Sequence, residues 1–448
     1  MFAKLHSKLG DFWWYSILLF CACRLADGFN AFIGLWLVPK YIGTEELGAV
    51  LPLLSFAAFI SMPANVFAMV FMKEIISLAT HGEYGKMKSL MRGVFAGTGV
   101  FLLIAIVVSH FIFPLFLQRI RIEKGSLGLL ILASAFCSAV APIYSNALQA
   151  LKRFNAVAFI NVVSAPFRFL TMIIAIPFRA LSGYFVGQIA QPALMIVSSL
   201  FCLRKELSVT SEPFWNKAIF RRISIFFTFL MLYNVSGGIL GLIEQTVLRQ
   251  RLPEIDSAAY YMATRFSEIA GLIGATFMTI MFPFTAEMAE QGRPTLPLII
   301  KSSLWTLILH AILAFLFVVI GEIILSLLPN GNQYAEYAWA IPWLIAISAL
   351  SYIPGIHINT EVSAGRFNFL KWWLPLHVAL ASTFLIATGH DFLAAILPKR
   401  LCHVFSERNL LSLEAILWWF TASTTIKVAF SLIDLFKQHF QQMKAINQ

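Results

Sequence analysis

The fold is decided by long apolar stretches such as LIIKSSLWTLILHAILAFLFVVIGEIILSL (Leu298–Leu327), in which Lys301 and Glu322 are the charged residues. A helix needs about 20 apolar residues to cross the hydrocarbon core of a bilayer. Comparable stretches recur along the whole chain of 448 residues. The sequence therefore predicts an all-α polytopic membrane protein with about twelve transmembrane helices. The expected spans are 12–39, 47–72, 93–115, 127–151, 157–178, 181–203, 223–247, 259–286, 298–327, 337–360, 367–388 and 412–436.

The composition supports the same class. Hydrophobic residues make up 59% of the chain and charged residues 12%, with a mean hydropathy of +0.80. Soluble domains run at roughly 45–50% apolar and about 25% charged residues. A soluble enzyme and a disordered chain are both excluded. The net charge of +11 lies mostly in the loops, so it does not indicate nucleic-acid binding.

The distribution of Lys and Arg predicts the orientation. Loops on the side of the N-terminus carry most of these cations, as in Lys86, Lys88, Arg153 and Lys205. An excess of cations marks the cytoplasmic side of a bilayer. With an even number of spans, both termini of this multi-pass protein are expected in the cytoplasm.

The chain is expected to form two lobes of six helices each. The longest cytoplasmic loop between spans, RKELSVTSEPFWNKAIFRR (Arg204–Arg222), falls near the midpoint. We therefore predict an N-terminal lobe over 1–203, a linker over 204–222 and a C-terminal lobe over 223–448. Segment Lys40–Glu74 resembles Arg251–Glu287, which suggests a parallel repeat. Repeats of this kind place a substrate site between the lobes near the middle of the membrane.

Charged residues inside the spans are candidates for function, because a charge in the bilayer core is costly unless it is paired or faces water. Arg24 and Asp27 share one face of the first helix, and Arg168 lies near the middle of the fifth. Guanidinium groups bind phosphate in a bidentate manner and keep their charge. Arg24 and Arg168 therefore suit an anionic head group such as a diphosphate, with Asp27 balancing the charge or taking up H⁺ or Na⁺.

The C-terminal half holds a second set of such charges. Arg265 and Glu268 repeat the i,i+3 spacing, Glu244 lies near the outer end of its span, and Lys427 about two turns from the cytoplasmic end of the last one. Arg265 is a candidate for the anionic head group, and Glu268 and Glu244 are candidates for ion coupling or charge balance. Plainer interpretations stay open: both i,i+3 pairs as closed structural pairs, Glu244 as an interfacial residue, and Lys427 reaching to the membrane surface.

No nucleotide-binding, zinc-protease or other catalytic motif occurs, so a transporter without a resident cofactor is expected. The largest external loop, 389–411, combines apolar and basic residues and is expected to lie in the membrane interface. A membrane-bound glycan polymerase or ligase is an alternative that would use residues of this loop. The available ones are His390, Asp391, Arg400, His403 and Glu407.

Four stretches resemble bacterial polysaccharide flippases of the multidrug/oligosaccharidyl-lipid/polysaccharide (MOP) exporter superfamily. They are LVPKYIGTEELGAVLPLLSFAAFIS (Leu37–Ser61), ALQALKRFNAVAFINVVSAPFRFL (Ala147–Leu170), GYFVGQIAQPALMIVSSLFCLRK (Gly183–Lys205) and YYMATRFSEIAGLIGATFMTIMFPFTAE (Tyr260–Glu287). The resemblance covers roughly residues 12–436.

The resemblance implies two six-helix lobes around a cavity that opens to one side of the membrane at a time. It also implies that the cargo is a polyprenyl-diphosphate-linked oligosaccharide, coupled to an ion gradient or to the membrane potential, with membrane lipids and polysaccharide-assembly proteins as further partners. Arg24, Asp27 and Arg168 match positions of charged cavity residues in such proteins. The alternative within the same fold is a cation-coupled multidrug antiporter, for which Asp27 would be the coupling carboxylate.

Overall fold

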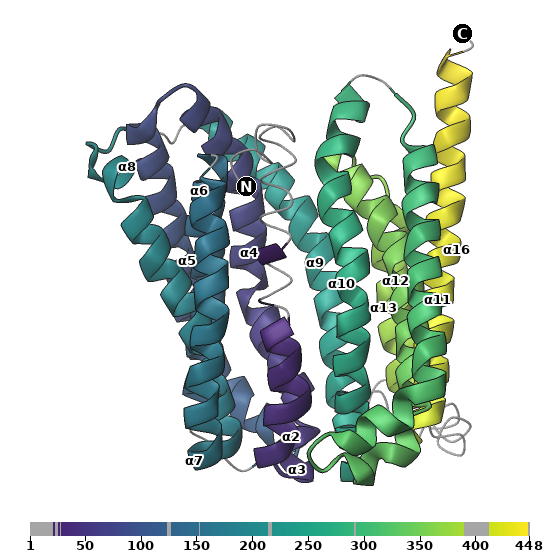
Figure 1. Ribbon diagram of the computed structural model, residues 1–448. Coiled ribbons are helices and arrows are strands. Elements are labelled where there is room, and N and C mark those ends of the chain that lie inside the picture. The colour runs from purple at the N-terminus through teal and green to yellow at the C-terminus, as the bar shows by residue number, and fades with distance from the viewer. Residues whose placement is uncertain are drawn as a thin grey trace, which may run out of the picture. The chain divides into compact units, whose positions relative to one another are not determined.

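The computed structural model describes residues 21–22, 26, 28–122, 127–151, 153–213, 217–290, 293–388 and 412–446. These residues form helices joined by short turns (Figure 1). In chain order the elements are η1 (Ile33–Leu37), α2 (Val38–Tyr41), α3 (Thr44–Leu47), α4 (Val50–Thr80), α5 (Tyr84–Arg119), α6 (Leu127–Ala150), α7 (Phe154–Cys202), α8 (Arg204–Ser208), α9 (Lys217–Arg251), α10 (Glu254–Glu290), α11 (Leu296–Leu327), η2 (Gly331–Tyr337), α12 (Ala340–Ser363), α13 (Leu370–Ala387) and α16 (Leu413–Ile446).

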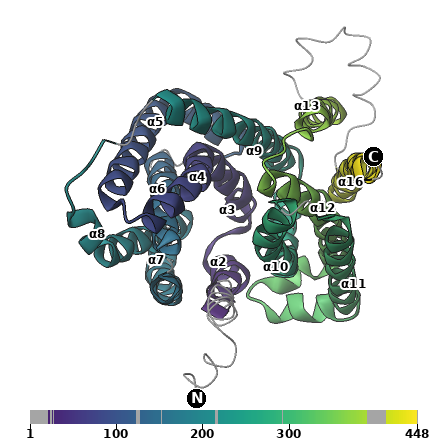
Figure 2. The same ribbon diagram turned by 90° about the horizontal axis from the view of Figure 1, so that it is seen from above.

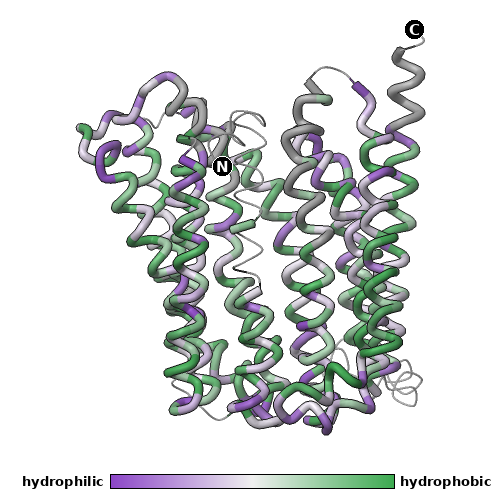
Figure 3. The backbone as a smooth tube through the Cα atoms, viewed as in Figure 1, coloured by the Kyte–Doolittle hydropathy of each residue, from purple (hydrophilic) through white to green (hydrophobic). Residues whose placement is uncertain are grey.

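The prediction of an all-α polytopic membrane protein is confirmed. Each expected span from 47–72 onward lies in a helix, and the first, 12–39, is described only in its second half. Within the described residues, eight helices are long and apolar enough to cross a membrane. Apolar residues predominate along most of these helices (Figure 3).

α7 contains two of the expected spans. Its helical dihedral angles are interrupted at Ala180, where φ is 44° and ψ is −120°, so the chain reverses there. The two halves pack closely: a methyl group on Gly183 would lie 2.2 Å from the carbonyl oxygen of Ala175, and one on Gly187 would lie 2.1 Å from Cγ of Met172. This antiparallel register places Arg168 opposite Gln191.

The chain divides into two compact units, Met1–Ile42 with Val50–Leu242, and Gly43–Ala49 with Ile243–Gln448. The expected boundaries at 203 and 223 stay a prediction. In the first unit, α6 packs against α4, α5 and α7. The amide of Asn146 on α6 donates to the carbonyl oxygen of Ala68 on α4 (3.2 Å), and Phe67 on α4 stacks on Phe227 of α9.

In the second unit, α12 packs against α10, α11 and α16 (Figure 2). Its approach to α10 is close because Gly274 has no side chain: a methyl group there would lie 2.4 Å from the ring of Tyr352. The Tyr352 hydroxyl donates to the carbonyl oxygen of Gly271. Trp343 on α12 donates to the hydroxyl of Thr421 on α16 (2.8 Å). Small residues and polar contacts of this kind stabilise helix packing in membranes.

The turn 43–49 packs with the second unit although it joins two helices of the first. α3, which lies in this turn, packs against α10. Arg249 is fully buried and donates to the carbonyl oxygen of Glu45 (2.8 Å). Gly48 lies so close to Ser257 that an added methyl group would be 2.7 Å from its Cβ atom. The turn is therefore an integral part of the second unit.

The external loop 389–411, with the residues on which the polymerase or ligase alternative depends, lies outside the described residues. The segment Asn234–Gly238, although it contains two glycines, lies inside the continuous helix α9.

Candidate functional site

Arg168 is half-buried in the first unit, where two side-chain amides hold it. Its Nη1 donates to Oδ1 of Asn30 at 2.8 Å and to Oε1 of Gln191 at 3.1 Å. Both acceptors are neutral, and together they fix the plane of the guanidinium group. The turn at Ala180 places Gln191 on the half of α7 that runs back past Arg168.

Aromatic side chains surround this arginine on one side. Phe169 follows it in α7 and contacts the rings of Phe29 and Phe32, with centroid distances of 5.6 Å in each case. Asn30 lies between these two phenylalanines in the chain, so the same contact positions its amide against Arg168. The first helix and α7 thus form a polar centre of Arg168, Asn30 and Gln191, with aromatic rings beside it.

The other predicted residues of the first helix, Arg24 and Asp27, lie outside the described residues. Their expected placement near Arg168 stays a prediction. Asn30 and Gln191 were missed in the sequence. One signal was available: Asn30 lies three residues after Asp27, on the same helix face.

Arg265 and Glu268 form the ion pair that their spacing suggests. Nη1 of Arg265 lies 2.7 Å from Oε2 of Glu268, and the guanidinium carbon lies 4.8 Å from the centre of the Tyr261 ring. The arginine side chain is 13% exposed and the glutamate side chain 52%. This ion pair is compatible with the interpretation of Arg265 and Glu268 as a structural pair. Because Glu268 is exposed, its side of the pair is accessible to solvent.

Glu244 and Lys427 interact electrostatically inside the second unit. Lys427 lies 14 residues after the start of α16 and 19 before its end, because the helix continues to Ile446 rather than ending near residue 436. Each distance corresponds to more than about 20 Å of helix. Lys427 is therefore a mid-helix residue of α16, and its reach to the membrane surface stays a prediction. Next to Glu244, Gln245 donates to the hydroxyl of Tyr260 (3.2 Å).

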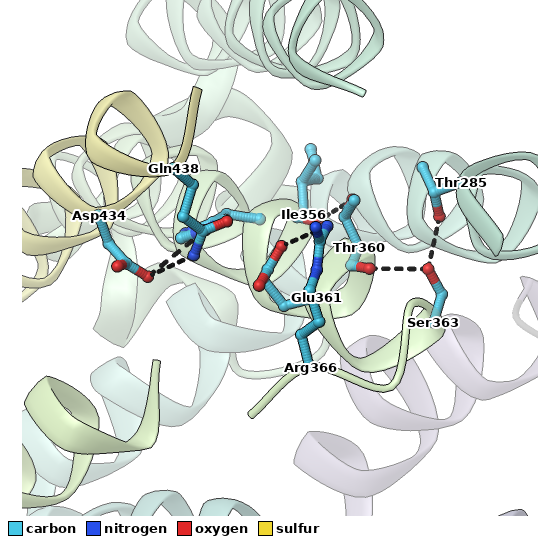
Figure 4. Close-up of polar contacts among 9 residues, drawn as sticks. Thr285, Ile356, Thr360, Glu361, Ser363, Arg366, Asp434 and Gln438 are labelled. Atoms are coloured by element: carbon cyan, nitrogen blue, oxygen red, sulfur yellow. Dashed lines mark hydrogen bonds and ion pairs between the residues drawn. The ribbon is translucent and has the colours of Figure 1, made fainter. Parts of the chain in front are cut away.

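A further polar cluster joins α12 to α16 and was not singled out in the sequence (Figure 4). It contains His357 and Glu361 on α12, Asp434 and Gln438 on α16, and Arg366 in the turn after α12. The expected spans explain the omission. The tenth ended at residue 360, which left Glu361 outside it, and His357 was interpreted as a packing residue.

Comparison with known proteins gives a likeness of structure but not of sequence. No family model matches the chain, and no curated protein matches it. Among solved structures, an inward-facing multidrug resistance MATE family transporter of the MOP superfamily is 12% identical, with a TM-score of 0.66, over 93% of this chain and 95% of that one.

Two further structures give the same result. A mutant of the Vibrio cholerae MATE transporter VcmN is 12% identical, with a TM-score of 0.65, over 98% of this chain and 97% of that one. An outward-facing MATE transporter of the MOP superfamily is 13% identical, with a TM-score of 0.63, over 95% of each chain. This multi-pass membrane protein therefore has the fold of the MATE transporters of the MOP superfamily.

Proposed function

We propose that the chain is a transporter that moves polyprenyl-diphosphate-linked oligosaccharides across the bacterial cytoplasmic membrane, for the synthesis of a cell-surface polysaccharide. It has no catalytic role, and both termini lie in the cytoplasm. The fold supports a transporter, since the similar solved structures are transporters. The resemblance of the four quoted stretches to polysaccharide flippases supports the cargo.

Arg168 is the observation that carries the choice of an anionic cargo. The guanidinium group belongs to a half-buried side chain of the first unit, and the amides of Asn30 and Gln191 orient it. A fixed, planar guanidinium matches two phosphate oxygens at once, which an ammonium group does less well. A diphosphate that reaches Arg168 would therefore find a preorganised partner.

The remaining predicted residues have secondary roles in this proposal. Arg24 adds a second cation for the diphosphate, and Asp27 limits the net positive charge so that the cargo is released. Arg265 contacts the head group late in the cycle, when Glu268 is displaced from it. Glu244 contributes to charge balance together with Lys427.

A cation-coupled multidrug antiporter is the second candidate. The observation that favours it is that similar solved structures include transporters described as multidrug resistance proteins. In such a transporter, Arg168 would be a structural residue and a carboxylate would bind the cationic drug. The flippase therefore requires the positive charge of Arg168 for transport, whereas the antiporter requires the negative charge of a carboxylate.

The deciding experiment is mass spectrometry of polyprenyl-diphosphate-linked glycans in a deletion strain and its parent. We expect finished, lipid-linked repeat units to accumulate in the deletion strain and to return to the parental level on complementation with the wild-type gene. The Arg168→Ala variant should insert normally but fail to clear the pool. Arg179→Ala, which changes an exposed arginine of the same helix, is the matched control and should complement.

An unchanged glycan pool in the deletion strain would overturn the flippase proposal. If the same strain became sensitive to cationic drugs, the antiporter would replace it. Clearance of the pool by both Arg168→Ala and Arg24→Ala would reject the diphosphate contact specifically, while leaving the transport of the glycan in place.

A further inference from the structure

α12 and α16 face each other with polar residues one helical turn apart on each side. His357 and Glu361 lie four residues apart on α12, and Asp434 and Gln438 lie four residues apart on α16. His357 is 1% exposed and Glu361 is 2% exposed. Residues four apart share one face of a helix, so both pairs are directed into the same contact. Figure 4 shows Glu361 and Asp434 on these two helices.

The contacts within this α12–α16 cluster connect the two helices and the turn that follows α12. Nη2 of Arg366 lies 2.9 Å from Oε1 of Glu361. Nδ1 of His357 is 2.8 Å from the hydroxyl oxygen of Ser431. Gln438 donates to Oδ2 of Asp434 (3.1 Å), and the same oxygen lies 3.8 Å from Nε2 of His357.

Two buried atoms of the cluster are left without a hydrogen bond. Among the described residues, neither Oε2 of Glu361 nor Nε2 of His357 has a hydrogen-bond partner. The 3.8 Å between Nε2 and Oδ2 of Asp434 is longer than a hydrogen bond. Buried polar atoms in native proteins are almost always bonded, so these two atoms are the places in the cluster where a further hydrogen or a water molecule can be accommodated.

The charges of the cluster do not balance. Two carboxylates, Glu361 and Asp434, face one guanidinium group, that of Arg366, which leaves one negative charge over when His357 is neutral. α11 carries Lys301, and α13, which packs against α16, carries Lys371; both lysines are exposed. α10 brings Met281 and the hydroxyl of Thr285, and α11 brings Ile299, around the apolar residues Ile356 and Leu435. Lys437 on α16 is exposed.

We propose that the α12–α16 cluster is a binding site for one proton, which it takes from the water at the end of the second unit where Arg366 is accessible. The proton moves from solution onto the cluster and neutralises its excess charge, with no further reactant. Because His357, Glu361 and Asp434 interact, the bound proton belongs to the group and not to a single residue.

The chemistry of the cluster favours a proton over a metal ion. Hard cations are bound by several oxygen ligands, whereas here the atom without a hydrogen bond that faces Asp434 is an imidazole nitrogen, 3.8 Å from Oδ2. In the part of the chain that the structure describes, no three His, Cys, Asp or Glu side chains are placed to hold a metal ion. A proton needs only one lone pair and a second acceptor nearby, which Nε2 and Oδ2 provide after a small closure of the gap.

Proton uptake by the purified full-length protein, in a weak buffer between about pH 8 and about pH 5, tests the proposal. We expect the wild-type protein to take up about one proton per chain more than Glu361→Gln, because that substitution removes the excess charge. Glu336→Gln, the same change at an exposed residue of η2, is the matched control and should behave like the wild type. Arg366→Gln should take up about one proton more than the wild type, since it removes the cation.

Equal uptake by the wild type and Glu361→Gln would overturn the proposal. Should Glu361→Gln aggregate on size-exclusion chromatography, Asp434→Asn replaces it with the same expected loss, and normal uptake by that variant would also overturn the proposal. Displacement of the proton by sodium chloride, but not by choline chloride, would overturn it in favour of a sodium site. The uptake measurement is made on purified protein without cargo. A negative result would therefore reject the proton site without bearing on the proposed transport of glycans.

Discussion

At the scale of single residues, a charge inside a membrane helix is defined by its partners. Arg168 has two amide acceptors that hold its plane, Arg265 has an ion-pair partner on its own helix, and Lys427 has an electrostatic partner on another helix. These three cationic side chains therefore have different kinds of partner, and we expect substitution of each, or of its partner, to have a different effect.

Gln191→Glu tests whether the charge of Arg168 is used for transport. The substitution keeps the shape of the side chain and places a carboxylate beside Nη1, about 3 Å away, where charge-assisted hydrogen bonds are strong. We expect insertion to be normal and clearance of lipid-linked glycan to fall at least tenfold, because the cation is neutralised locally. Gln191→Leu, which removes the acceptor without adding charge, should have a smaller effect. Equal clearance by Gln191→Glu and the wild type would contradict this role.

We predict that replacing Glu244 or Lys427 alone destabilises the protein more than replacing both together. The two side chains carry opposite charges and are half-buried; removing one of two such charges leaves the other uncompensated, whereas replacing both is often neutral. Glu244→Gln and Lys427→Met should therefore each lower the midpoint of thermal unfolding in detergent, and the double variant should recover most of the loss. Additive effects would show that the two side chains do not interact.

At the scale of helices, the apolar stretches predicted the spans but not their true lengths. Apolar patterning reports only the part of a helix that lies in hydrocarbon, whereas α5 begins at Tyr84 rather than near 93, and α16 continues to Ile446 rather than ending near 436. α12 likewise ends at Ser363 rather than at 360, which explains why Glu361 was not counted among the charges of the spans. The partners Asn30, Gln191 and Asp434 depend on how helices face one another, which a hydropathy pattern does not contain.

Gly183→Ala tests the packing of the two halves of α7. The added methyl group would lie 2.2 Å from the backbone oxygen of Ala175, which has little freedom to move. We expect a loss of about 1–3 kcal/mol, as for other overpacked sites, seen as a lower midpoint of thermal unfolding. Gly97→Ala is the control, because its methyl group would meet nothing within 4 Å and alanine favours the helix. A stable Gly183→Ala variant would mean that the two halves do not pack this closely.

The short helix η2 is fixed to α10 by a contact that depends on pH. Tyr337 donates to Oδ1 of Asp256 at 2.6 Å. Tyr337 precedes the membrane-spanning helix, which begins at Ala340 rather than at 337, and Asp256 precedes the expected span 259–286. Burial, this hydrogen bond and the charges of Asp256 and Glu336 raise the pKa of the Tyr337 phenol above its ordinary value. A raised pKa in the folded state adds stability that is complete below the ordinary value of about 10 and is lost as the pH rises through the folded value.

Tyr337→Phe should therefore cost about 1–2 kcal/mol at neutral pH and show a weaker loss of stability above about pH 10 than the wild type. Thermal unfolding over a series of alkaline buffers measures both. Tyr41→Phe, at an exposed tyrosine, should keep the alkaline loss of the wild type. Identical alkaline profiles for Tyr337→Phe and the wild type would contradict the stated role of this contact.

At the scale of the whole molecule, the sequence predicted a six-plus-six arrangement from the central loop and a weak repeat. In the structure, both repeat segments, Lys40–Glu74 and Arg251–Glu287, consist of the end of one helix, a short connection and the first part of a long helix. The assignment of residues 43–49 to the second unit was not foreseen. It follows from the contacts of Arg249 and Ser257, which no local pattern reveals.

That assignment has a consequence for biosynthesis. The ribosome makes residues 43–49 about 200 residues before it makes Arg249 and Ser257, and translation runs at about 5–20 residues per second. For at least ~10 seconds the nascent turn has no native partner, so the second unit cannot complete its packing while the first half of the chain is being inserted. Termination of synthesis anywhere before α10 would leave the turn without the surface on which it rests.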